Sequence, residues 1–103
     1  MNKKIRSMLS LAMKAGKIKT GAQACEISLS DGTASLVIIC SDASDNTKEK
    51  FINKANYYKK PYVIYGTIDD VSASIGRDNR SVITVTEQGF GDTIKKLMID
   101  DEQ

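Results

Sequence analysis

Two patterns of apolar residues alternate along the chain. In five segments apolar side chains recur every three or four residues, which is the spacing of one face of an amphipathic helix. The first such segment sets Ile5, Leu9 and Ala12 against Lys3 and Ser7, and it ends at Gly16. The pattern predicts four further helices, from Gly21 to about Ser30, from the 41–47 loop to about Tyr58, from Thr67 or Asp69 to Gly76, and around Phe90 to Met98.

Short apolar runs lie between the predicted helices. Leu36–Cys40 and Tyr62–Tyr65 are continuous and rich in β-branched or aromatic residues, so we expect buried strands, the first covered on both faces. Ile18-Lys19 and Val82–Val85 are the other two predicted strands. Alternating helices and strands indicate an α/β fold, a three-layer α/β/α sandwich around a mixed central sheet of about four strands. Without repeats or linkers, the 103 residues are expected to form one domain over 1–103.

Charge is distributed unevenly, although the net charge is only +2. Every ionisable side chain among the first nineteen residues is basic, whereas the acidic run Asp100, Asp101 and Glu102 stands just before the last residue. A basic segment of this kind suits a partner that carries phosphates. No apolar run reaches the length of a membrane span, and no signal-peptide core follows Met1. We therefore expect a cytoplasmic protein that does not contact membranes.

The residues of common catalytic and metal sites are missing from the sequence. It contains no histidine, which excludes Ser-His and Cys-His chemistry and the usual zinc sites. Cys25 and Cys40 fall within apolar patterns and belong to no CxxC motif, so we expect buried thiols. The acidic pairs Asp69-Asp70 and Asp42 with Asp45 stand near predicted helix starts, where acids usually act as caps.

The segment from Lys17 to Ala24 is the most informative one. A basic extended stretch passes through Gly21 into a helical pattern, and a glycine there lets another backbone approach the free N–H groups of the helix N-terminus. We expect Lys17 and Lys19 to contact phosphates at the N-terminus of this helix. The glycine spacing from Gly16 to Gly21 also matches a phosphate-binding loop, but Ala22-Gln23 replace the Lys-Ser or Lys-Thr that a nucleotide site requires. An ordinary strand-to-helix turn with solvated lysines is the alternative interpretation.

Four landmarks then follow one another along the chain. They are Ala15-Gly16-Lys17 with Thr20-Gly21, the run from Ile39 to Ser44 before Asn46-Thr47, the run from Pro61 to Gly66, and Ile75-Gly76 before the last predicted strand. Together they resemble the L7Ae/L30e ribosomal protein family of kink-turn RNA binders, in particular its small bacterial YlxQ-like branch. The resemblance covers nearly the whole chain. It implies an α/β/α sandwich, no catalysis, and binding of a sharply bent internal-loop RNA.

The glycine-led helix of that family reads Gly-Thr/Ala-Asn-Glu-x-x-Lys, and its Asn, Glu and Lys touch the RNA at the kink. The matching positions here are Gly21, Ala22, Gln23, Ala24 and Ile27. Helical geometry independently places Gln23, Ala24 and Ile27 on one face and turns Cys25 and Leu29 towards the core. The placement of this helix therefore agrees with the resemblance.

Three of these positions differ from the family pattern, and two of them lose the contact. Gln23 can read a base edge through its amide, but Ala24 cannot accept a hydrogen bond from a base and Ile27 cannot contact a phosphate. Each lost base contact costs about 1–3 kcal/mol. We therefore expect weaker kink-turn binding than the family pattern implies, with Ile27 free to stack on RNA or to pack against another partner.

The family's second contact is the loop before the last strand, which here is Gly76 to Ser81. Arg77 and Arg80 can stack on unpaired bases or bridge phosphates. The alternative is that both arginines flank Asp78 in a solvated turn. The other group of lysines, on the predicted helix up to Tyr58, is expected to be scattered and to serve solubility; it consists of Lys48, Lys50, Lys54, Lys59 and Lys60.

These observations predict a non-enzymatic RNA-binding protein that needs no cofactor and acts as a monomer. Its expected partners are a structured RNA, ribosomal or regulatory, and ribosomal or translation proteins. A protein-interaction module that docks through Ile27 is the second candidate, and a small-molecule enzyme, which lacks acid, base and nucleophile sets, is the third. The predicted RNA-binding residues are Lys17, Lys19, Thr20, Gly21, Gln23, Ala24, Ile27, Ser41, Asp42, Ala43, Gly76, Arg77, Arg80 and Ser81.

Overall fold

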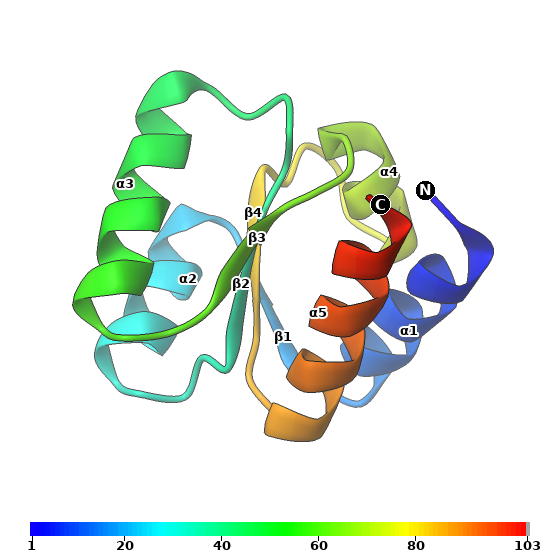
Figure 1. Ribbon diagram of the computed structural model, residues 1–103, viewed down its shortest axis with the longest axis horizontal. Helices are drawn as coiled ribbons and strands as arrows, with labels where there is room; N and C mark the ends of the chain where they lie inside the picture. Colours follow the sequence, from blue (N-terminus) through cyan, green and yellow to red (C-terminus); the bar gives the residue numbers. More distant parts are fainter. Residues whose placement is uncertain (103) are drawn as a thin grey trace.

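The computed structural model, which describes residues 1–102, contains a four-stranded mixed sheet between two layers of helices (Figure 1). This arrangement confirms the predicted α/β/α sandwich. The predicted elements are all present, with ends that differ by at most three residues. They are α1 (Lys3–Lys14), β1 (Ile18–Thr20), α2 (Ala22–Ser30), β2 (Leu36–Ile39), α3 (Asp45–Tyr57), β3 (Tyr62–Ile64), α4 (Ile68–Ser74), β4 (Val82–Val85) and α5 (Gln88–Asp101).

The strand order in the sheet is β1-β4-β2-β3. β4 pairs antiparallel with both β1 and β2, and β2 pairs parallel with β3. The predicted strand at Tyr62–Tyr65 is present, and Val63 and Tyr65 are buried, but the strand is not buried throughout. β3 lies at the edge of the sheet, where Ile64 is 36% exposed. The apolar run alone could not distinguish an edge strand from a central one.

Each face of the sheet has its own hydrophobic cluster. On one face α1, α4 and α5 pack against the strands, with Leu9, Val71 and Ile94 fully buried, and on the other face α2 and α3 bury Leu29 and Phe51 (Figure 1). Cys25 and Cys40 are free and buried, as predicted. Burial raises the pKa of each thiol to about 12, so both stay protonated at neutral pH.

Side chains cap four of the five helices within residues 1–102. Asn2, Ser44, Thr67 and Glu87 each accept a hydrogen bond from a backbone N–H in the first turn of α1, α3, α4 and α5, respectively. Thr67 is therefore the cap of α4, and Asp69 only lies in its first turn. Such caps supply acceptors that the first turn of a helix cannot find within the helix itself.

α5 passes very close to the start of β2. A Cβ added to Gly91 would lie 2.5 Å from Ser35 Oγ and 3.6 Å from the Cβ of Leu36. Ser35 Oγ cannot easily move away, because it is 2.9 Å from the carbonyl oxygen of Val85 and 3.0 Å from that of Glu87. The absence of a side chain at Gly91 thus sets the distance between α5 and the sheet.

We expect Gly91→Val to lower the free energy of unfolding by about 1–3 kcal/mol, because a side chain forced into a packed site displaces its neighbours. Thermal or urea unfolding measures this loss. Thr93→Val is the matched control, since it places the same side chain at an exposed position of α5. If both variants were equally stable, α5 would not be held at this close distance.

Candidate functional site

Three of the segments predicted to bind RNA meet at one end of the sheet. The backbone N–H of Gly21, at the end of β1, donates to the carbonyl oxygen of Val82 over 3.4 Å. The N–H of Cys40, at the end of β2, donates to the carbonyl oxygen of Ser81 over 2.9 Å. We call this region the sheet-end surface; it comprises Thr20–Ala24, Ser41-Asp42 and the loop Gly76–Ser81.

The N-terminus of α2 is open at the sheet-end surface. Unlike α1, α3, α4 and α5, this helix receives no side-chain cap within residues 1–102, since its N-cap residue is Gly21. The first N–H groups of α2 thus point outwards with the partial positive charge of the helix end. This combination of donors and charge can hold an anionic oxygen.

The backbone conformation at Gly21 requires a glycine. Its φ is 86° and its ψ is 158°, a region that residues with a side chain hardly ever adopt. A Cβ built at Gly21 would meet no heavy atom within 4 Å, so packing within the protein does not exclude a side chain there. Gly21 therefore sets the direction in which the chain enters α2 and leaves open space in front of the helix.

The outward face of α2 is the one that helical spacing predicted. Gln23 is exposed, Ala24 is half-buried, and Ile27 is 55% exposed, whereas Cys25 and Leu29 are buried. Beside this face lies a hollow of about 210 Å³. Its lining residues are Lys19, Ala24, Ile27, Ser28, Asp31 and Thr33.

The two lysines expected at the N-terminus of α2 lie at opposite ends of β1. Lys19 lies in β1 and lines the hollow beside α2. Lys17 precedes β1 at the opposite end of the strand, where its N–H donates to Ala12 and its carbonyl accepts from Thr86. Lys19 thus belongs to the neighbourhood of the α2 N-terminus, and Lys17 does not.

The loop Gly76–Ser81 presents two arginines. Its backbone is held by Ser72, whose Oγ accepts from the N–H of Arg80 over 2.8 Å, and by the thiol of Cys40, which lies 3.5 Å from the carbonyl oxygen of Arg80. Within residues 1–102, neither Arg77 nor Arg80 forms an ion pair, even with the adjacent Asp78, and the buried Nε of Arg80 has no hydrogen-bond partner. Nη1 of Arg77 lies 3.3 Å from the carbonyl oxygen of Gly76, so Arg77 can offer only its other N–H groups to an outside acceptor.

The segment after β2 contributes less to the sheet-end surface than predicted. Ala43 was expected at the interface, but it is only 6% exposed and packs in the cluster that contains Phe51, so its side chain cannot reach a partner. Asp42 accepts a hydrogen bond from the N–H of Ile68 over 2.8 Å and thereby ties this loop to α4. Ser41 is exposed.

Part of the predicted solubility group of lysines has a structural role that the sequence did not reveal. Lys50 and Lys54 of α3 lie 3.0 and 3.5 Å from Glu26 Oε1 of α2. Hydrogen bonding to Lys50 is the main cause that lowers the pKa of Glu26. These two lysines therefore connect α3 to α2 and are not scattered charges.

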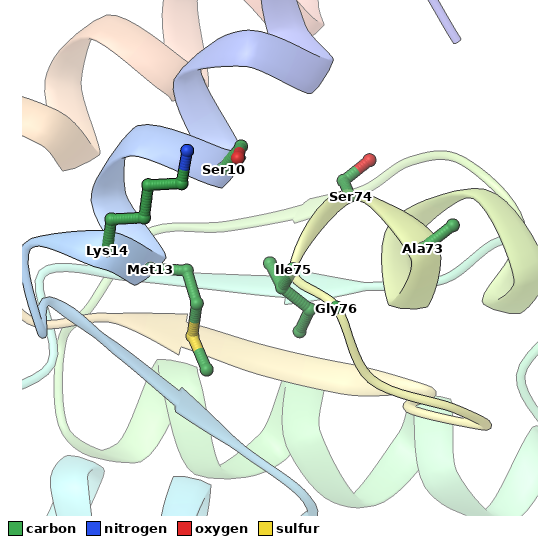
Figure 2. A pocket seen from close by; sticks show the side chains of 7 residues that line it. All are labelled: Ser10, Met13, Lys14, Ala73, Ser74, Ile75 and Gly76. Atoms are coloured by element: carbon green, nitrogen blue, oxygen red, sulfur yellow. The ribbon is translucent and has the colours of Figure 1, made fainter.

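A second hollow was not predicted, because its two walls are some sixty residues apart in the sequence. It has a volume of about 260 Å³ and lies between α1 and the C-terminal end of α4 (Figure 2). Figure 2 shows Ser10 and Lys14 on α1 across from Ser74 and Gly76. Its lining residues are Ser10, Met13, Lys14, Ala73, Ser74, Ile75 and Gly76.

Residues 1–102 do not bring three or more Cys, Asp or Glu side chains together as a metal site would need. None of the helices that the structure describes is long and apolar enough to span a membrane.

Comparison with known sequences identifies close relatives. A model of the family described as ribosomal protein L7Ae/L30e/S12e/Gadd45 matches residues 3–95. A protein of Bacillus subtilis (strain 168) named RNA-binding protein YlxQ is 36% identical over 91 residues, which cover 88% of this chain and 91% of the relative. A protein of the same name from Enterococcus faecium is 32% identical over 95 residues, covering 92% of this chain and 91% of the relative.

Solved structures share the fold. A protein of unknown function from Bacillus halodurans C superimposes with a TM-score of 0.91 at 32% identity, covering 95% of this chain and 99% of that one. The 15.5kD RNA binding protein of Giardia lamblia has a TM-score of 0.75 at 19% identity, covering 99% of this chain and 91% of that one, and shows that the architecture is shared. With a family model that matches residues 3–95 and relatives above 30% identity over most of its length, the chain belongs to the ribosomal protein L7Ae/L30e/S12e/Gadd45 family.

Proposed function

We propose that this chain is a non-enzymatic RNA-binding protein, cytoplasmic and monomeric, that holds a bent internal-loop RNA of the kink-turn type on its sheet-end surface and works with ribosomal or translation partners. The observation that carries the proposal is the uncapped N-terminus of α2 beside two arginines without ion pairs. Both features offer donors and positive charge at one place, as a phosphate chain requires. The names of the two sequence relatives, RNA-binding protein YlxQ, agree with it.

The geometry suggests a division of roles on the sheet-end surface. The first N–H groups of α2 and the ammonium group of Lys19 would hold phosphates, which position the RNA without reading its sequence. The exposed amide of Gln23 would read a base edge. Arg77 and Arg80 would stack on unpaired bases or bridge phosphates, since a guanidinium group can do both.

The salt dependence of binding tests the proposal. We expect Lys19→Ala to weaken binding to every RNA and to flatten the log–log slope of affinity against salt by roughly 0.7–0.9, or one phosphate contact, and Lys17→Ala to leave the slope unchanged. Affinity measured over a series of salt concentrations gives this slope. Lys17→Ala is the matched control, because Lys17 and Lys19 lie at opposite ends of β1.

Each outcome of this experiment shows which part of the molecule binds RNA. If only Lys19→Ala flattened the slope, the interface would be confined to the α2 end of β1. If neither variant changed it, the RNA would bind elsewhere on the molecule. A wild-type protein that binds no RNA at low salt would contradict the proposed function as a whole.

The second candidate function is a protein-interaction module in ribosome assembly or translation. It is favoured by one observation, the 55% exposure of Ile27 beside a hollow. Burial of an apolar side chain in a partner does not weaken as salt rises, whereas phosphate binding does. A ribosomal partner whose affinity survives high salt and is lost in Ile27→Ser would support this candidate over RNA binding.

A further inference from the structure

α1 carries basic side chains at both of its ends. The helix contains Lys3, Lys4, Arg6 and Lys14 and no acidic residue. Arg6 is partly neutralised by Asp70 at 4.0 Å, but Lys14 is exposed and forms no ion pair within residues 1–102. Lys14 is therefore a free positive charge in the last turn of α1.

Ser10 and Lys14 connect two hollows on this side of the molecule. They line the hollow of about 260 Å³ against the end of α4 (Figure 2). They also line one of about 510 Å³ along α1 itself. The second hollow includes Leu11, whose side chain is 53% exposed. We call the joined surface the α1 groove; its residues are Arg6, Ser7, Ser10, Leu11 and Lys14, with Ser74–Gly76 on the facing wall.

The α1 groove is continuous with the sheet-end surface through one loop. Gly76 forms part of the groove wall, while Ser81, at the other end of the same loop, is hydrogen-bonded to Cys40 at the sheet end. Six residues connect these two points and span at most about 20 Å. A nucleic-acid strand carries about one phosphate per 3.4 Å, so about six nucleotides are enough to follow the loop from one surface to the other.

We propose that the α1 groove is a second RNA contact, which takes the backbone of a helical arm that leaves the RNA bound at the sheet-end surface. This proposal rests on the proposed function. RNA suits the groove because Lys14 and Arg6 attract phosphates, and the exposed face of Leu11 can pack against ribose. Ser10 lines both hollows, and its hydroxyl group can exchange a hydrogen bond with a 2′-hydroxyl group of RNA.

Two RNAs with the same bent internal loop test this inference. The first RNA has short helical arms on both sides of the loop. The second has the same loop, but one arm is longer by about eight base pairs, which is more than the path along Gly76–Ser81 requires. We expect the wild-type protein to bind the extended RNA more tightly and with a salt slope steeper by roughly 0.7–0.9, for one phosphate contact by Lys14. We expect Lys14→Ala to remove roughly 0.7–0.9 of that slope and to leave binding of the short RNA unchanged.

Lys96→Ala is the matched control, since it removes one exposed lysine from α5, outside the α1 groove. It should leave both slopes unchanged, and Lys14→Arg should keep the gain from the extended arm. If the wild-type protein bound both RNAs equally, or if Lys14→Ala and Lys96→Ala had the same effect, the second contact would be refuted while the sheet-end site stood. Loss of both RNAs in Lys14→Ala would place Lys14 in the first site and equally overturn the inference.

Discussion

Gly21→Val is expected to lower both the stability of the protein and its affinity for RNA. With φ at 86° and ψ at 158°, any residue with a side chain strains the backbone, at a cost of about 1–3 kcal/mol. That cost corresponds to a fall in melting temperature of roughly 4–8 °C per kcal/mol for a domain of this size. The valine side chain would also stand in front of the open N–H groups of α2. Binding should therefore fall even at temperatures where the variant is fully folded.

Gly32→Val separates these two effects. Gly32 follows the other end of α2, has a similar φ of 82°, and likewise has open space where a Cβ would be. Thermal unfolding and RNA affinity should be measured on both variants. Similar melting temperatures with RNA loss only in Gly21→Val would support contact at the α2 N-terminus. If both variants lost RNA affinity equally, backbone strain would be the cause of the loss. If Gly21→Val kept its RNA affinity, the N-terminus of α2 would not belong to the interface.

Restoring the family pattern on α2 should strengthen recognition of a kink-turn. We expect Ala24→Glu with Ile27→Lys to raise affinity for a standard kink-turn RNA at least tenfold, or about 1.4 kcal/mol, because the pair supplies a base acceptor and a phosphate contact. The fold should tolerate both changes, since Ile27 is 55% exposed and Ala24 borders an open hollow beside Lys19.

An unstructured RNA is the control for this gain. The double substitution adds one negative and one positive charge, so the net charge of the protein stays at +2. Binding of the unstructured RNA should therefore change little. Equal gains on both RNAs would show that only local charge had been added, and no gain on either would show that this face of α2 does not meet RNA.

The parts of the site that follow from local spacing were predictable from the sequence. Helical periodicity alone separates the exposed Gln23 and Ile27 from the buried Cys25 and Leu29. Gly21 was also predicted to leave room for another backbone at the helix N-terminus, and a Cβ built there would meet no heavy atom within 4 Å. These inferences need only a few neighbouring residues.

The parts that depend on distant segments could not be read in this way. The burial of Ala43 depends on the packing of α3, and the pairing of Glu26 with Lys50 depends on how α2 and α3 lie on the sheet. The hollow between Lys14 and Gly76 forms only when α4 folds back beside α1. Sequence spacing contains no direct record of such contacts, because they join residues far apart along the chain.

The missing cap of α2 also has a dynamic consequence. A helix whose first turn lacks an acceptor opens locally at a low free energy, and backbone amides in such a turn exchange their hydrogens with solvent readily. A bound phosphate would supply the acceptor and suppress this opening, so part of the binding free energy would be used to order the first turn of α2. Slower amide exchange at Ala22, Gln23 and Ala24 would then report occupancy of the site, and the RNA itself would complete the fold of this helix.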